Sequence, residues 1–196
     1  MPMQGILKLM TIFLGANDAS TDPNAGQFVP IDRFKQNLVA IINHESVRAH
    51  SPKIILITPP PVEETILLET VKGFGGSEQP RKQRVTKKYA TAVCEVGKQT
   101  GVAVLDIWKD FMFKAGWIEG DDTMPGSEEN GKSIALMDLL YDGLHLSPAG
   151  YEAVFLSLMA LIEANWPELS PERMPFAVRC DWEKGKTVQS SDERIT

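Results

Sequence analysis

Three short apolar runs recur along the chain and set its organisation. They occupy residues 9–14, 53–58 and 102–107 and are rich in Ile, Val and Leu. A short, nearly continuous apolar run is typical of a strand that is buried on both faces, as strands are in a parallel sheet. Each run therefore predicts a buried parallel strand.

Helical spacing of apolar residues fills the stretches between these runs. Residues 30–49 and 83–100 show it, and so do a shorter segment at 108–117 and a final helix at 148–165, while residues 134–140 lead into the turn before that helix. Strands that alternate with helices join by right-handed crossovers. The pattern predicts an α/β fold, a three-layer α/β/α sandwich of flavodoxin-like type, formed as one domain by residues 1–175.

The other segments carry turn-forming residues. Residues 19–29 and 63–80 are expected to be irregular loops, the second being a mobile part of a lid. Pro59, Pro60 and Pro61 end the second strand because proline cannot continue a central strand, and they either only terminate it or also line a pocket. Residues 176–196 are expected to be a C-terminal tail, partly disordered.

Composition narrows the possible partners. The chain has 196 residues, 43% of them hydrophobic, with a formal net charge of -6 and a pI of about 5.1. This balance argues against nucleic acid or an anionic membrane as the main partner. Cys94 and Cys180 show no metal or redox spacing, and Cys94 is expected to be a buried thiol. The chain has no transmembrane run, so a cytoplasmic location is the default expectation, and its oligomeric state stays open.

The clearest chemical motif is the stretch Asp142-Gly143-Leu144-His145-Leu146-Ser147-Pro148. Ser147 and Pro148 are typical of the first positions of a helix. A carboxylate three residues before an imidazole can fix its tautomer, so that His145 acts as a general base. The alternative is a turn in which Asp142 only caps backbone amides; the full motif before an amphipathic helix favours catalysis.

A second polar turn follows the first predicted strand and contains Gly15, Asn17 and Asp18. Chemistry in α/β proteins is usually placed at the carboxyl ends of parallel strands. Taken alone, these residues could equally do no more than shape a turn.

Together, the two motifs resemble sequence blocks of the SGNH (GDSL-like) hydrolases, and within them most closely the isoamyl-acetate-hydrolysing esterases. The resemblance implies a serine esterase that acts on small carboxylic esters without a metal or organic cofactor. It implies that His145 and Asp142 complete a catalytic triad. It also implies that Asn17, together with Gly15, belongs to the oxyanion and substrate-binding side.

The resemblance covers roughly residues 9–175 and leaves the family's nucleophile unaccounted for. The family fold has five strands, of which this chain accounts for the last three, and no serine here lies in the family's Gly-Asp-Ser context. Ser147 is better explained as a helix cap. We therefore expect an N-terminally shortened chain that lacks two βα units and is nearly inactive alone. A catalytically dead binding protein is the alternative. A third possibility is a flavodoxin-like small-molecule binder, but no glycine-rich phosphate loop follows any predicted strand, which argues against it.

Overall fold

A three-stranded parallel sheet forms the centre of the computed structural model, which describes residues 5–24 and 26–173. The strands are β1 (Leu9–Phe13), β2 (Lys53–Ile57) and β3 (Ala103–Leu105), in the order β1-β2-β3. Ile12 of β1 pairs with Leu56 of β2, which pairs with Val104 of β3. The predicted α/β class and the parallel direction of all three strands are thereby confirmed.

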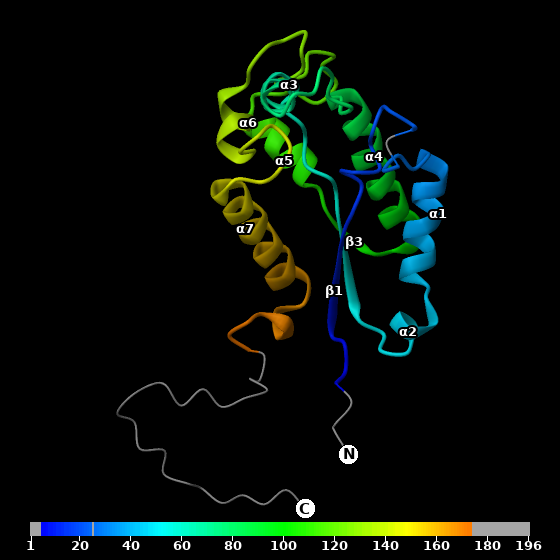
Figure 1. The fold of residues 1–196 in the computed structure, drawn as a ribbon. Coiled ribbons are helices and arrows are strands. Elements are labelled where there is room, and N and C mark those ends of the chain that lie inside the picture. The colour runs from blue at the N-terminus through cyan, green and yellow to red at the C-terminus, as the bar shows by residue number, and fades with distance from the viewer. Residues whose placement is uncertain (1–4, 25, 174–196) are drawn as a thin grey trace, which may run out of the picture.

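Helices cover both faces of this sheet (Figure 1). One face carries α1 and α4, and the other carries α5, α6 and α7, which gives the three layers. The helical elements in chain order are α1 (Ile31–Ile42), α2 (Glu45–Arg48), α3 (Glu64–Gly73), α4 (Gln83–Thr100), α5 (Ile107–Lys114), α6 (Ile134–Leu139), α7 (Pro148–Asn165) and the short 3-10 helix η1 (Pro167–Leu169).

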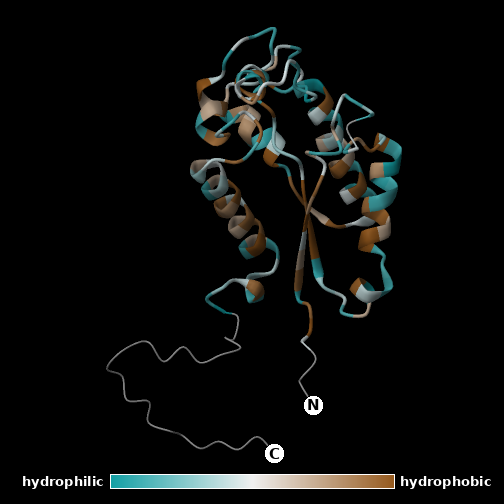
Figure 2. Ribbon diagram, in the orientation of Figure 1, coloured by the Kyte–Doolittle hydropathy of each residue, from teal (hydrophilic) through white to brown (hydrophobic). Residues whose placement is uncertain are grey.

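Alternating side chains of the middle strand feed two separate cores. Ile55 and Ile57 are buried with α5, α6 and α7, whereas Leu56 is buried with α1 and α4. Hydropathy colouring shows apolar strands between α1, which carries polar residues on its outer side, and α7, which is apolar along most of its length (Figure 2). Because β2 is apolar on both faces, it behaves as the buried parallel strand that its sequence predicts.

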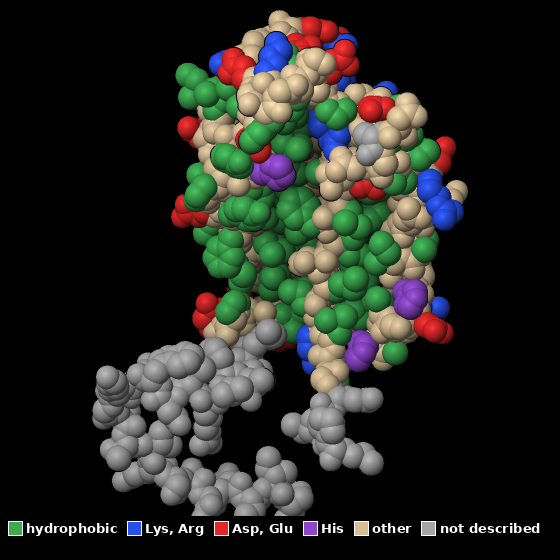
Figure 3. All heavy atoms as spheres, in the orientation of Figure 1, with side chains coloured by type: hydrophobic (Ala, Val, Ile, Leu, Met, Phe, Trp, Pro, Cys, Tyr) green, Lys and Arg blue, Asp and Glu red, His purple; other side chains and the backbone are tan. Residues whose placement is uncertain are grey.

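The same prediction is wrong for β1. Thr11 and Phe13 are exposed, and only Ile12 is fully buried. The reason is topological: β1 pairs with β2 on one side and has no strand on its other side among the described residues. Figure 3 shows the consequence, a broad face of hydrophobic side chains that runs from the β1 edge across to α7.

Three local predictions need correction. Residues 63–80 are not an irregular lid loop, because α3 forms there with Glu63 as its N-cap and Leu67 buried. The helix predicted over residues 30–49 is two helices, with His44 capping the second. The third strand ends early because Asp106 accepts a hydrogen bond from the Lys109 N–H and starts α5.

Among the described residues, no helix is long and apolar enough to cross a membrane. The predicted tail, residues 176–196 with Cys180, lies entirely outside the described residues, which end at Arg173.

Candidate active site

The loop that carries His145 is closed at its base and ends in a capped helix. Leu140 and Leu146 form an antiparallel bridge, and the Tyr141 N–H donates to the His145 carbonyl at 2.9 Å. Ser147 then caps α7, its Oγ accepting the Gly150 N–H at 3.0 Å, with Pro148 as the first helical residue. The loop is therefore fixed at both ends, of which the sequence predicts the second, the capped start of α7.

The same loop is docked onto the start of α3. The Glu63 N–H donates to the Gly143 carbonyl at 2.8 Å, and the Thr70 hydroxyl donates to the Asp142 carbonyl at 3.3 Å. Gly143 has φ +85°, and a Cβ placed on it would lie 2.5 Å from the Glu63 carbonyl oxygen. Only glycine fits this conformation and this close approach.

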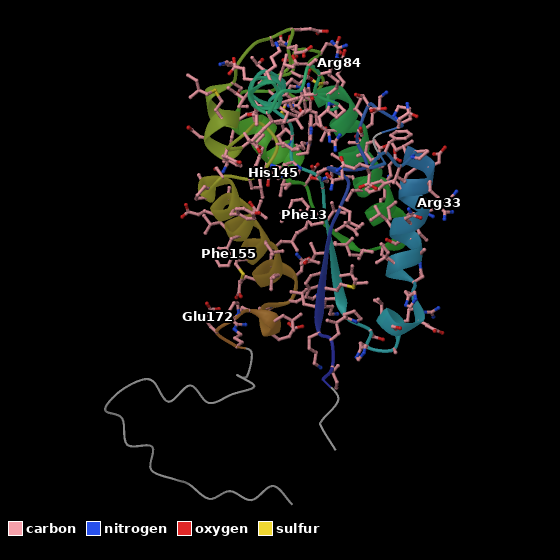
Figure 4. All side chains as sticks on the ribbon, in the orientation of Figure 1. Phe13, Arg33, Arg84, His145, Phe155 and Glu172 are labelled. Carbon is pink, nitrogen blue, oxygen red and sulfur yellow. The ribbon has the colours of Figure 1, made fainter. Side chains whose placement is uncertain are left out.

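Asp142 and His145 make direct contact. Asp142 Oδ2 lies 2.7 Å from His145 Nδ1, while Asp142 Oδ1 accepts the backbone N–H groups of Leu144 at 3.0 Å and of His145 at 2.8 Å. The Asp142 side chain is 11% exposed and that of His145 is 71% exposed. A largely buried carboxylate thus holds an exposed imidazole. Figure 4 shows where His145 lies, between α7 and the end of β1.

Hydrogen bonding keeps Asp142 ionised. Burial alone would raise the pKa of its carboxyl group, but the hydrogen bonds from the His145 ring, the His145 N–H and the Leu144 N–H outweigh burial and lower that pKa. At neutral pH the group facing His145 is therefore a carboxylate, the form that can accept the Nδ1 proton.

The Asn17 turn follows β1 directly. Gly15 is buried at φ +115° and a Cβ on it would lie 3.2 Å from both Phe34 and Pro59. The Gly15 carbonyl accepts the Ala19 N–H at 3.0 Å, and Asn17 itself is exposed. This glycine lets the chain turn tightly around buried Pro59, and Asn17 lies exposed in the turn that follows the strand.

Both predicted motifs lie at the carboxyl-end rim of the sheet. Asn17 follows the end of β1, and the His145 loop is bonded to Glu63, which follows the end of β2. Figure 4 shows His145 above Phe13, the last residue of β1. The buried residues Pro59, Pro60 and Pro61 lie in the segment between β2 and Glu63.

Two buried charged residues near this rim were missed by the sequence analysis. Glu63 is fully buried, and its carboxylate accepts the Ile66 N–H and, at 3.4 Å, the Ser133 N–H. Arg81 is 4% exposed and donates to the Ala16 carbonyl. Glu63 could have been predicted as a helix cap from its place before an amphipathic segment, whereas nothing local in the sequence marks Arg81 as buried.

Within the part of the chain that the structure describes, no group of three or more His, Cys, Asp or Glu residues could hold a metal ion. A hollow of about 310 Å³ lies beside the Asn17 turn, between the end of β1 and α1. Its lining residues include Leu14, Asp18, Phe34 and Leu38.

The structure is thus a three-layer α/β sandwich with an Asp142–His145 contact in the loop that precedes its last long helix, α7. Residues 2–153 match the family model described as GDSL-like Lipase/Acylhydrolase. The chain belongs to that family, which confirms the resemblance seen in the sequence.

Named relatives support the same assignment. The chain is 34% identical over 169 residues to the isoamyl acetate-hydrolyzing esterase 1 homolog of Mus musculus, covering 85% of this chain and 60% of that protein. It is 31% identical over 170 residues to the isoamyl acetate-hydrolyzing esterase of Schizosaccharomyces pombe, covering 86% and 56%. The crystal structure of a lipase/acylhydrolase from Enterococcus faecalis matches with a TM-score of 0.52 and 26% identity, covering 79% and 60%. The chain thus spans about three fifths of the length of the relatives it matches.

Proposed function

We propose that this chain supplies the base, its orienting carboxylate and one oxyanion donor of an esterase that cleaves small carboxylic esters. The observation that carries the proposal is the 2.7 Å contact between Asp142 Oδ2 and His145 Nδ1, with the imidazole otherwise exposed. The names of the relatives as esterases that hydrolyse isoamyl acetate point to small esters as the substrate class.

In the proposed reaction, a serine Oγ attacks the ester carbonyl carbon and gives its proton to His145 Nε2. Asp142 stabilises the imidazolium, and the Asn17 amide donates to the oxyanion. The C–O bond to the alcohol then breaks, and the alcohol takes the proton from His145. Water, activated by the same imidazole, releases the acid from the acyl-serine.

The nucleophile is proposed to come from outside this sequence. No serine here follows a glycine and an aspartate. Ser147 is occupied as the cap of α7, and the Ser20 Oγ is bonded to the backbone of Asp22. A polypeptide segment that adds a strand at the open β1 edge would bring a nucleophile to the rim where His145 and Asn17 lie. We therefore expect the chain alone to be nearly inactive.

The experiment compares three preparations with p-nitrophenyl acetate and a fluorophosphonate probe: the chain alone, its His145→Ala variant, and the chain co-expressed with a segment that carries a strand and a Gly-Asp-Ser block. Activity and serine labelling that appear only on co-expression, and disappear with His145→Ala, support the proposal. Fluorophosphonate labelling of the chain alone that His145→Ala abolishes would show that one of its own serines is the nucleophile.

One observation favours a second candidate, a non-catalytic binding protein: the absence of a Gly-Asp-Ser block from this sequence. In that case the co-expressed segment restores no turnover, while isoamyl acetate still binds the chain, is not cleaved, and perturbs the His145 ring signals. The transcript upstream of the Met1 codon separates the two further, since an in-frame Gly-Asp-Ser segment there supports the esterase.

A further inference from the structure

The Asn17 turn is held from behind by an arginine more than sixty residues further along the chain. Arg81 Nε donates to the Ala16 carbonyl at 3.0 Å, Nη2 donates to Gln27 Oε1 at 2.7 Å, and Nη1 donates to the Pro80 carbonyl at 3.0 Å. One guanidinium therefore joins the turn after β1, the loop that follows it and the start of α4.

Backbone contacts strengthen the same connection. Residues Ser20 and Arg81 form an antiparallel bridge, and the Thr21 N–H donates to the Pro80 carbonyl at 2.9 Å. The Arg81 backbone N–H donates to Gln79 Oε1 at 2.7 Å. The segment before α4 thus lies along the Asn17 turn as a brace.

The guanidinium of Arg81 is buried and forms no ion pair among the described residues. Arg81 is 4% exposed, and it takes part in none of the ion pairs found among the described residues. Burial lowers the pKa of its guanidinium, and Asp18 opposes that change only in part. A buried cation without an ion-paired carboxylate is costly for folding, and a leucine or methionine of similar volume would avoid that cost. Its position beside the proposed oxyanion side offers a use for the charge, because a positive charge there favours a developing negative one.

We propose that Arg81 is a positioning residue for the oxyanion side of the site, a role that rests on the proposed function of Asn17. Its Nε fixes the peptide between Ala16 and Asn17. Because it donates to the carbonyl of that peptide, it also polarises the Asn17 N–H on the peptide's other end. The Asn17 side chain and N–H are then presented together at the rim that His145 shares.

The test uses the intact chain labelled with ¹⁵N-asparagine and titrated with acetate, the carboxylate product of an acetyl ester. The Asn17 signals are assigned by their loss in Asn17→Ala. The variants are Arg81→Met, which removes the positive charge and the guanidinium N–H donors, and Arg81→Lys, which keeps the charge. The matched control is Arg84→Met, three residues further on in the first turn of α4, where the arginine is exposed and pairs with Glu129.

We expect acetate to shift the Asn17 signals of the unmodified chain and of Arg84→Met with equal affinity. In Arg81→Met the Asn17 signals move and acetate affinity falls about tenfold, whereas the signals of Asn37 and Asn165 stay in place, which separates loss of positioning from unfolding. Arg81→Lys should recover part of the affinity.

Two outcomes overturn the inference in distinguishable ways. If acetate shifts the Asn17 signals equally in Arg81→Met and in the unmodified chain, Arg81 does not position the turn, while the proposed function stands. If acetate does not shift the Asn17 signals of the unmodified chain, the proposed role of the rim itself is wrong, and the role of Arg81 falls with it.

Discussion

Asp142 holds His145 by two contacts at once, the ring through Oδ2 at 2.7 Å and the backbone N–H through Oδ1 at 2.8 Å. The carboxylate therefore folds the loop and orients the imidazole with the same two oxygens. A structural cap and a catalytic orienter are not alternatives at this position, because one geometry serves both.

Replacing Asp142 by alanine should destabilise the chain by about 1–3 kcal/mol, because the Leu144 and His145 N–H groups lose their acceptor. The pH dependence carries a second signature. The pKa of Asp142 is lowered on folding, so its contribution is present above the unfolded value and is lost as pH falls through the lower folded value. Urea unfolding between neutral and acidic pH measures both effects.

The control for this experiment is Asp122→Ala, since Asp122 is an exposed aspartate in a loop. It should change stability by less than about 0.5 kcal/mol. If the stability lost in Asp142→Ala stays constant as the solution is acidified through the titration range of aspartate, the proposed ionised state of Asp142 is wrong.

Replacing Gly143 by alanine should cost about 2–4 kcal/mol. The left-handed φ of +85° accounts for part of this, and the 2.5 Å approach to the Glu63 carbonyl oxygen accounts for the rest. The matched control is Gly131→Ala, where φ is also positive at +74° but nothing lies within 4 Å of the new Cβ. Thermal unfolding of both variants separates backbone strain from collision; equal losses in the two would show that the loop yields without cost.

Glu63 should show the opposite pH behaviour to Asp142. Burial raises the pKa of its carboxyl group despite the hydrogen bonds from Ile66 and Ser133. The folded state then binds the proton more tightly than the unfolded chain, so the native chain loses stability as pH rises from the unfolded to the folded pKa. Glu63→Gln removes this titration. The difference in unfolding free energy should therefore move in favour of the variant across that range, and a difference independent of pH would contradict the shift.

Apolar periodicity predicts this fold well where burial is local, and less well where it depends on distant neighbours. The helix over residues 83–100 and the cap at Ser147 were predicted correctly, because their signals lie within a few residues. The apolar run of β1 predicts burial on both faces, which is wrong, since such a run does not reveal whether a second strand lies beside it. Exposure of this strand is expected only from the lack of the two βα units that would cover it. The helix α3 was missed because the glycines and prolines of this stretch predict an irregular loop, although they lie only at the ends of the helix or outside it.

The site residues, too, could be predicted only where their contacts are local in the sequence. The contact between Asp142 and His145 spans three residues, so their spacing could predict it. The link from Arg81 to Ala16 spans 65 residues, and no spacing rule brings those two segments together. What the sequence lacked was the tertiary arrangement around each polar group, not the chemistry of the group.

Cys94 should be nearly inert to alkylation while the chain is folded. Burial, together with the neighbouring Asp106 carboxylate, raises the pKa of its thiol from 9.0 to about 12. At pH 8 the thiolate fraction then falls about 1,000-fold, and iodoacetamide reacts only with the thiolate. A Cys180→Ser background isolates Cys94, and mass spectrometry follows labelling with and without urea. Labelling in the folded chain at the rate of a free thiol would contradict this prediction.

The apolar face between β1 and α7 should make the isolated chain associate with itself. Phe155 on α7 is 57% exposed and Phe13 at the end of β1 is 38% exposed, and both belong to the hydrophobic face in view (Figures 3 and 4). An exposed apolar edge of this kind favours association. Phe155→Glu places a charge there that association would have to bury, so the dissociation constant measured by sedimentation should rise at least about tenfold.

Phe74→Glu is the control for that experiment. Phe74 lies at the end of α3 and is 89% exposed, so this substitution adds the same charge and removes more exposed apolar area, but at another place. It should leave the dissociation constant unchanged, so that the effect of Phe155→Glu can be assigned to the face beside β1 rather than to net charge. A segment that completes the β1 edge, such as the one proposed to carry the nucleophile, should abolish the association in the same way. Sedimentation of an unmodified chain that stays monomeric at about 100 μM would show that this face does not drive association.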